Sequence, residues 1–213
     1  NKVFKYPYKK NIVKRNLEII KFALKFTFNN EDVKSKLPFL YSPNINIINQ
    51  ISKTKKNIIL IPGASHISKR YPASRFAQLS NLINANFIII WGDKDEKILA
   101  NDIKSLSSNV NIAEKLSLSA LISLINKVDL VIGPDTGPTH IAWALNVPSI
   151  TIFGPTPGYR NTYETKINKI IQSNSVVNAY KLDKKDMSIK DIDVKKIIQL
   201  VKDLTTRWNL ASL

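Results

Sequence analysis

Short runs of consecutive apolar residues alternate with amphipathic segments from residue 57 to the end of the chain. The apolar runs lie at 57–63, 86–92, 109–114, 128–133, 147–154 and 168–173. Between them, apolar residues recur at helical spacing over 72–85, 95–106, 117–127 and 138–146, and again over 191–208. Continuous apolar strands that alternate with helices indicate a parallel sheet covered on both faces. The predicted fold is α/β, a doubly wound parallel sheet.

The chain before residue 57 has a different pattern. Residues 8–28 place apolar residues at helical spacing with lysines between them, and residues 37–50 read as an extended stretch with two prolines. We therefore expect two parts: a connecting segment between domains at 1–56, made of a helix and an extended stretch, and an α/β domain at 57–213. Since the chain starts at Asn1 and its only methionine is Met187, we interpret it as part of a longer protein.

Composition narrows the possible chemistry. The chain has no cysteine, which excludes disulfides and thiolate metal sites and is compatible with a reducing cytoplasm. His66 and His140 are its only histidines, so we expect no metal site. No apolar run approaches the roughly 18 residues that would cross a bilayer.

The net charge of +16, from 32 basic and 16 acidic residues, is large for 213 residues. It favours nucleic acid, an anionic membrane surface or a phosphorylated substrate as partner. The abundance of Asn and Ile suggests another explanation for the net charge, namely the codon bias of an A/T-rich genome. The basic residues are spread along the chain without zinc-finger spacing, which argues against nucleic acid.

Much of this charge lies in the segment before residue 57, interleaved with aromatic and aliphatic residues. Such a basic amphipathic pattern can rest on anionic head groups. Alternatively, the apolar residues pack against another domain and the lysines are merely solvated. The pattern consists of Lys5, Lys9, Lys10, Lys14, Arg15, Lys21 and Lys25 among Tyr6, Tyr8, Ile12, Leu17, Phe22 and Phe26.

The stretch GPDTGPTH, residues 133–140, joins a predicted strand directly to a helix. Thr136 and Gly137 can direct backbone amides outward there, and Pro138 suits a first helical position. A helix N-terminus of this kind can hold a phosphate through its amides and dipole. The alternative is that Asp135 or Thr136 only caps the helix and that His140 is a packing residue.

The stretch PGASHISKRYP, residues 62–72, follows the first predicted strand. Gly63 permits a close backbone approach, Ser65 offers a hydroxyl, and Lys69 or Arg70 can neutralise a diphosphate. An ordinary surface turn with solvated charges explains the same residues. Neither stretch is a Walker loop or a G-x-G-x-x-G fingerprint, so the common nucleotide motifs do not apply.

Together these motifs carry a resemblance. IPGASHISKRYPASRFAQL, IIIWG followed by acidic residues, and KLSLSALISLINKVDLVIGPDTGPTHIAWALNVPSITIFGPT resemble the C-terminal half of lipopolysaccharide heptosyltransferases, glycosyltransferase family nine. Heptosyltransferase I is the nearest subtype, and the resemblance runs from about residue 9 to residue 205. It implies a Rossmann-like C-terminal domain of a two-domain GT-B glycosyltransferase, with residues 57–213 holding the sugar nucleotide.

The resemblance further implies an inverting, metal-independent transfer of heptose from ADP-heptose to the Kdo of the lipopolysaccharide inner core, with no cofactor. It places the acceptor site and the general base in an N-terminal domain that has no counterpart in this sequence, so we expect the chain alone to be inactive and assign no catalytic residue. It also implies a cytoplasmic protein, peripheral on the inner face of the bacterial inner membrane, and no nucleic-acid partner.

Site roles carry over by motif only. The expected contacts are Lys69 and Ser65 with the donor phosphates, Glu96 with the ribose hydroxyls, Leu116 with the adenine, Asp135 with the heptose hydroxyls, and Thr136, Gly137 and His140 with the diphosphate. Two other readings stay open: an inactive or stand-alone sugar-nucleotide-binding module, and, on charge alone, a basic protein that binds nucleic acid or a membrane surface.

Overall fold

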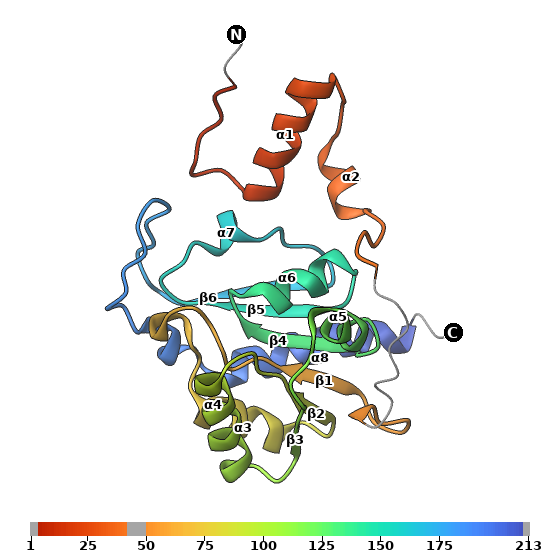
Figure 1. Cartoon of the computed structure of the whole chain (residues 1–213), viewed down its shortest axis with the longest axis vertical. Helices are drawn as coiled ribbons and strands as arrows, with labels where there is room; N and C mark the ends of the chain where they lie inside the picture. Colours follow the sequence, from red (N-terminus) through yellow and green to blue (C-terminus); the bar gives the residue numbers. More distant parts are fainter. Residues whose placement is uncertain (1–3, 42–49, 211–213) are drawn as a thin grey trace.

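The computed structural model describes residues 4–41 and 50–210. Within them, six parallel strands form one sheet in the order β3-β2-β1-β4-β5-β6 (Figure 1). The strands are β1 (Asn57–Leu60), β2 (Asn86–Ile89), β3 (Val110–Ile112), β4 (Leu130–Pro134), β5 (Ser149–Phe153) and β6 (Asn168–Gln172). This order confirms the predicted doubly wound α/β fold.

Helices flank the sheet and extend beyond it on the N-terminal side. They are α1 (Ile12–Leu24), α2 (Asn30–Lys34), α3 (Ala73–Leu82), α4 (Lys94–Leu106), α5 (Leu118–Ile125), α6 (Gly137–Ala144), α7 (Gly158–Asn161) and α8 (Val194–Leu210), with 3-10 turns η2 (Ile67–Lys69) and η3 (Ser188–Asp191).

The two faces of the sheet build two separate cores because successive strand residues point to opposite sides. In β1, Ile58 and Leu60 join the core under α3, α4 and α8, whereas Ile59 joins the core under α5 and α6. All three side chains are at most 1% exposed. The strands are thus apolar on both faces, which explains the continuous apolar runs in the sequence.

Every strand and helix predicted from residue 57 onward is present, with ends shifted by a few residues. The short elements α2, α7, η2 and η3 were not predicted, since three to five residues carry no readable periodicity. The helix predicted within 8–28 is α1. It begins after Asn11, whose side chain accepts from the amides of Val13 and Lys14, and it ends at Lys25 in a left-handed conformation with φ 54°.

The N-terminal segment stands on the α7 side of the α/β unit. Figure 1 shows α1 rising from a point close to α7, with α2 beside it. Helix α1 has no buried residue. The predicted extended stretch at 37–50 lies partly outside the described residues, because 42–49 are not among them. The division of the chain at residue 57 stays a prediction, although β1 begins there.

A search of residues 4–41 and 50–210 finds no helix that combines the length and the apolarity needed to cross a bilayer.

Candidate functional site: a crevice at the centre of the sheet

The centre of the sheet is its topological switch point. Strands β1 and β4 lie side by side, but the chain continues from β1 to β2 on one side and from β4 to β5 on the other. The connections diverge and leave a crevice at the carboxyl ends of these strands, where open α/β sheets bind ligands. The two stretches singled out in the sequence, after β1 and after β4, both end at this edge.

Asp135 is the centre of a polar network in this crevice. Its Oδ2 lies 3.2 Å from the Lys69 Nζ and accepts a hydrogen bond of 3.0 Å from the Asn161 side-chain amide. Its Oδ1 lies 3.2 Å from Nε2 of His140. The Asp135 and Lys69 side chains are only 9% and 13% exposed. The fold therefore joins both predicted stretches through one buried carboxylate.

The surroundings of Asp135 hold it in the charged form. Burial raises its pKa, because the carboxylate loses water. The hydrogen bond from His140, the ammonium of Lys69 and the amide of Asn161 act in the opposite direction and together outweigh it. The pKa of Asp135 consequently lies well below its usual range, and the side chain is an anion that already has Lys69 as a cationic partner.

The turn after Asp135 leads into α6 without a side-chain cap. Thr136 occupies the N-cap position but its side chain does not cap the helix, and proline lies at the start of α6 as predicted. The hydroxyl of Thr139 instead donates to the carbonyls of Thr136, at 2.7 Å, and Pro134. A β-carbon placed on Gly137 would meet no atom within 4 Å. The start of α6 thus has open space beside Gly137 and no side-chain cap, which is compatible with an anion site.

A cavity of about 210 Å³ opens beside this turn. Three predicted site residues, Glu96, Leu116 and Thr136, line it. Its apolar walls include Ile61 and Leu121. Glu96 Oε2 accepts from the amide of Gly92 at 2.7 Å, which fixes the carboxylate against the cavity. The cavity lies on the β2 side of the switch point, next to the Asp135 network.

Gly63 has a clear reason to be glycine. A β-carbon there would lie 2.0 Å from Oε1 of Glu96, so a larger residue would displace that carboxylate. In the structure it is the Glu96 carboxylate that lies close to Gly63, and a close approach of a ligand to this backbone stays a prediction.

The structure distinguishes between the other candidates in the loop after β1. Arg70 donates its Nε to the carbonyl of Ala64 at 3.1 Å, whereas Lys69 points to Asp135. Ser65 is exposed. It takes no part in the described contacts of Asp135 and does not line the 210 Å³ cavity. His140 contacts Asp135 and its side chain is 43% exposed, so it is not a buried packing residue.

Asn161 belongs to the network but was not among the predicted site residues. It lies in α7, which follows β5 after the second Gly-Pro turn at residues 154 and 155. The carboxyl end of β5 lies beside that of β4 in a parallel sheet, so side chains after it reach the same edge. The order of strands and helices in the sequence could therefore have indicated Asn161, although no motif marks this residue.

The residues of the crevice can bind a diphosphate and sugar hydroxyls through different groups. Lys69 and the amides of α6 supply positive charge that can stabilise a diphosphate and the charge that develops on it as a leaving group. The anionic Asp135 would repel a phosphate and is suited to accept hydrogen bonds from hydroxyl groups. Fold and site together define a Rossmann-type unit of the GT-B glycosyltransferase class.

Comparisons with known proteins agree with this class. Residues 1–190 match the model of glycosyltransferase family 9 (heptosyltransferase), and the chain belongs to this family. Lipopolysaccharide heptosyltransferase 1 of Campylobacter coli is 39% identical, over 96% of this chain. Lipopolysaccharide core heptosyltransferase OpsX of Haemophilus influenzae is 33% identical over 54% of the chain and 34% of its own length.

Solved structures share the fold. Escherichia coli heptosyltransferase WaaC with ADP superposes with a TM-score of 0.69 at 18% identity, covering 96% of this chain and 60% of WaaC. The complex of WaaC with ADP-2-deoxy-2-fluoro heptose gives 0.66 at 17% identity, covering 95% and 59%. The chain spans 64% of the length of the Campylobacter relative.

Proposed function

We propose that this chain forms the donor-binding part of an inverting, metal-independent heptosyltransferase. The donor is ADP-heptose, and the acceptor is the Kdo of the lipopolysaccharide inner core at the membrane surface. The observation that carries the proposal is the Asp135–Lys69–His140 network beside a cavity lined by Glu96 and Leu116. At the switch point, the ammonium of Lys69, which can bind a diphosphate, lies next to a cavity that can hold a nucleoside.

The roles of the site residues follow this layout. The adenine lies against Leu116 in the apolar part of the cavity, and Glu96 accepts from the ribose hydroxyls. Lys69, together with Thr136, Gly137 and His140 at the start of α6, contacts the diphosphate, and Ser65 contributes its hydroxyl from the surface of the loop. Asp135 accepts from the heptose hydroxyls. Because Asp135 already binds Lys69, one ammonium links the sugar site to the phosphate site.

Isothermal titration calorimetry with ADP, UDP and single-stranded DNA tests the donor class. We expect ADP to bind with micromolar affinity and UDP at least about tenfold more weakly, a difference of 1.4 kcal/mol. Equal affinity for ADP and UDP would refute an adenine site, and tight DNA binding without ADP binding would favour the nucleic-acid reading.

A turnover assay tests whether this chain only binds the donor or also catalyses the transfer. We propose that the 213-residue chain binds the donor without transferring heptose, because the resemblance assigns the general base to the family's N-terminal domain. A measurable transfer rate from this chain alone would refute this proposal and leave donor binding intact.

We further propose that the protein is cytoplasmic and attaches peripherally to the inner membrane. The support comes from α1, where Ile19, Ile20 and Phe22 are each more than 40% exposed on a helix that also carries Lys14, Arg15 and Lys21. Near an anionic surface each basic residue contributes about 1 kcal/mol. Co-sedimentation with anionic and neutral vesicles, at low and high salt, should show salt-sensitive binding to anionic vesicles that the double substitution Lys21→Glu and Lys25→Glu abolishes. Unchanged binding by this variant would contradict the proposal.

A further inference from the structure

Asn161, at the end of α7, bridges the anionic Asp135 and the cationic Arg160. Its Nδ2 donates to Oδ2 of Asp135 at 3.0 Å, and its Oδ1 accepts from Nη1 of Arg160 at 2.8 Å. A guanidinium only donates and a carboxylate only accepts, so these two partners fix which way the amide points. A flipped amide would present the wrong group to each partner. The side chain of Asn161 therefore has one favoured orientation.

Asn161 and Lys69 share one oxygen of Asp135. The Lys69 Nζ lies 3.2 Å from the same Oδ2, whereas Nε2 of His140 lies 3.2 Å from Oδ1. A carboxylate has about four lone-pair positions, two on each oxygen. Lys69 and Asn161 together occupy Oδ2, and His140 leaves room for a further donor on Oδ1. A hydroxyl group of a ligand would thus reach Asp135 through Oδ1.

Arg160 is held in turn by the segment before β1. Its Nε donates to the carbonyl of Tyr8 at 2.9 Å, and its guanidinium carbon lies 4.0 Å from the centre of the Tyr8 ring. Among residues 4–41 and 50–210, no carboxylate lies within 4.0 Å of Arg160. The guanidinium therefore links Tyr8 to Asn161, and through Asn161 to Asp135, instead of forming an ion pair of its own.

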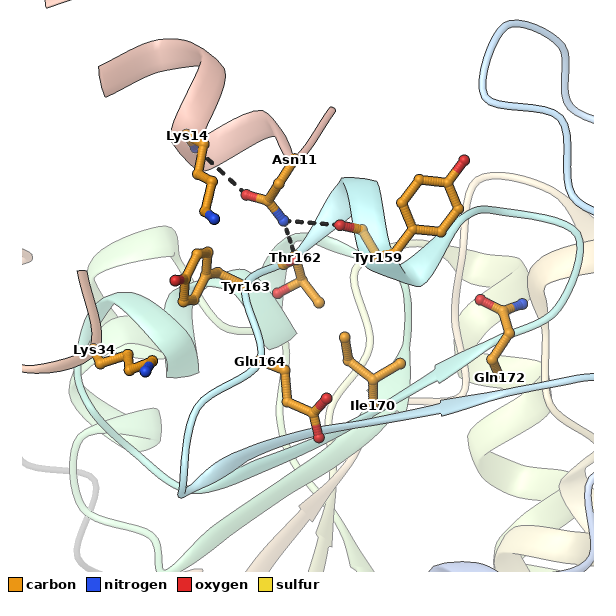
Figure 2. A pocket seen from close by; sticks show the side chains of 9 residues that line it. All are labelled: Asn11, Lys14, Lys34, Tyr159, Thr162, Tyr163, Glu164, Ile170 and Gln172. Carbon is orange, nitrogen blue, oxygen red and sulfur yellow. Dashed lines mark hydrogen bonds between the residues drawn. The ribbon is translucent and has the colours of Figure 1, made fainter. Parts of the chain in front are cut away.

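A second contact of the N-terminal segment holds the same short helix. Figure 2 shows the side chain of Asn11, at the start of α1, directed onto α7, where it donates to the carbonyls of Tyr159 at 3.0 Å and Thr162 at 2.6 Å. These two residues flank Arg160 and Asn161 in sequence. Helix α7 has four residues, and so short a helix has little stability of its own. The N-terminal segment therefore fixes α7, and with it Asn161.

We propose that Asn161 is a positioning residue for the donor sugar: held by Arg160, it fixes the Asp135 carboxylate so that Oδ1 accepts from a sugar hydroxyl. This role rests on the proposed function, in which Asp135 binds the heptose. It makes sugar recognition dependent on the segment before β1, because Tyr8 holds Arg160. ADP carries no sugar at Asp135 in that arrangement, so Asn161 should affect the binding of ADP-heptose and leave the binding of ADP unchanged.

Calorimetric titration of the full chain with ADP and with ADP-heptose measures the contribution of the sugar as the ratio of the two affinities. Asn161→Ala should reduce this ratio at least about threefold, the loss of one orienting hydrogen bond, with ADP affinity within about twofold of wild type. Asn81→Ala is the matched control at the end of α3, because Asn81 also accepts one hydrogen bond, from Ser107 at 2.7 Å, and donates one, to Leu106 at 3.3 Å. It should leave the ratio unchanged. An unchanged ratio in Asn161→Ala, or equal losses for both ligands, would overturn the positioning role.

A double-mutant cycle tests whether Arg160 acts through Asn161. Arg160→Met should reduce the affinity ratio in the same direction, because the amide of Asn161 loses the partner that orients it. The double variant should lose no more than Asn161→Ala alone, since removal of Asn161 already breaks the link to Asp135. Additive losses would overturn the role of Arg160. A loss of ADP affinity in Arg160→Met would also overturn it and would assign Arg160 to the diphosphate instead.

A spectroscopic readout separates positioning from a purely structural role. In nitrogen-15 spectra, ADP-heptose should shift the side-chain amide signals of Asn161, assigned by their absence from Asn161→Ala, and ADP should not; those of Asn81 should move with neither ligand. Equal shifts with ADP and ADP-heptose, or none, would overturn the proposal. If the wild type bound ADP-heptose no more tightly than ADP, the sugar role of Asp135 would fail and this inference with it. A full preference for ADP-heptose retained by Asn161→Ala would contradict this inference alone.

Discussion

The substitution Asp135→Asn tests the buried ion pair of the crevice because it removes the charge and keeps the shape. In the wild type, the Asp135 carboxylate contacts Lys69, His140 and Asn161 at 3.0–3.2 Å. The variant leaves the Lys69 ammonium, 13% exposed, without a carboxylate. Removing one partner of a buried pair costs about 3–5 kcal/mol. Since the asparagine side chain still offers an acceptor, we expect about 3 kcal/mol less stability.

Urea denaturation at pH 7 measures this loss, and Glu31→Gln is the matched control. Glu31 pairs with Lys34 at 2.7 Å, but the two side chains are 76% and 50% exposed. Exposed pairs are worth about 0.2–1 kcal/mol. We therefore expect a much smaller change for Glu31→Gln than for Asp135→Asn. A loss below about 1 kcal/mol for Asp135→Asn would refute the view that the crevice stabilises a buried charge.

The pH dependence gives a second check on the same residue. The pKa of Asp135 is lowered in the folded state, so its stabilisation is complete above the unfolded pKa of about 3.9. It is lost as the pH falls through the folded pKa. The stability difference between wild type and Asp135→Asn should narrow as the pH falls below about 4. A gap that widens in acid would contradict this assignment.

Four further substitutions test the donor site and the packing beside it. Lys69→Ala should weaken ADP binding by about tenfold or more in calorimetry, the value of a charge-assisted contact; affinity within twofold of wild type would show that Lys69 does not reach the phosphates. Asp135→Ala should reduce affinity for ADP-heptose more than for ADP, and equal losses would refute its role in sugar recognition. Gly63→Ala places its β-carbon 2.0 Å from the Glu96 carboxylate, which ends a flexible side chain and can turn away, so it should weaken ADP binding through the displaced Glu96 while changing stability by less than about 1 kcal/mol. Gly137→Ala, with open space around it, should change stability by less than about 0.5 kcal/mol. A loss above about 2 kcal/mol for Gly63→Ala in urea denaturation would show that Glu96 cannot move aside.

The fold could be predicted because its signals are strong and local. Strands such as β1 and β4 are buried on both faces, so their sequences are continuous apolar runs, and Gly-Pro turns mark where β4 and β5 end. Helix α8 carries its apolar residues on one face: Val194, Ile197 and Val201 are at most 3% exposed. Parallel strands joined by helices leave few topologies that obey the handedness and connection rules.

The site could be predicted only in part because its contacts join distant segments. The motif after β4 indicated Asp135 and His140, but nothing in sequence pairs Asp135 with Lys69, 66 positions earlier. Asn161 depends on the sheet order, and the contact of Glu96 with the Gly63 position depends on how α4 packs against the loop after β1. The placement of α1 beside α7, through Asn11, depends on tertiary contacts of a segment that the sequence showed only as amphipathic.

The most direct test of the central claim is to map ADP on the chain by amide chemical shifts. We predict that ADP shifts the amides of Lys69, Leu116, Gly137 and His140, and that it leaves the amides of residues 11–14, at the start of α1, unchanged. Shifts confined to residues 11–14, or no shifts at millimolar ADP, would contradict the assignment of the crevice between β1 and β4 as the donor site.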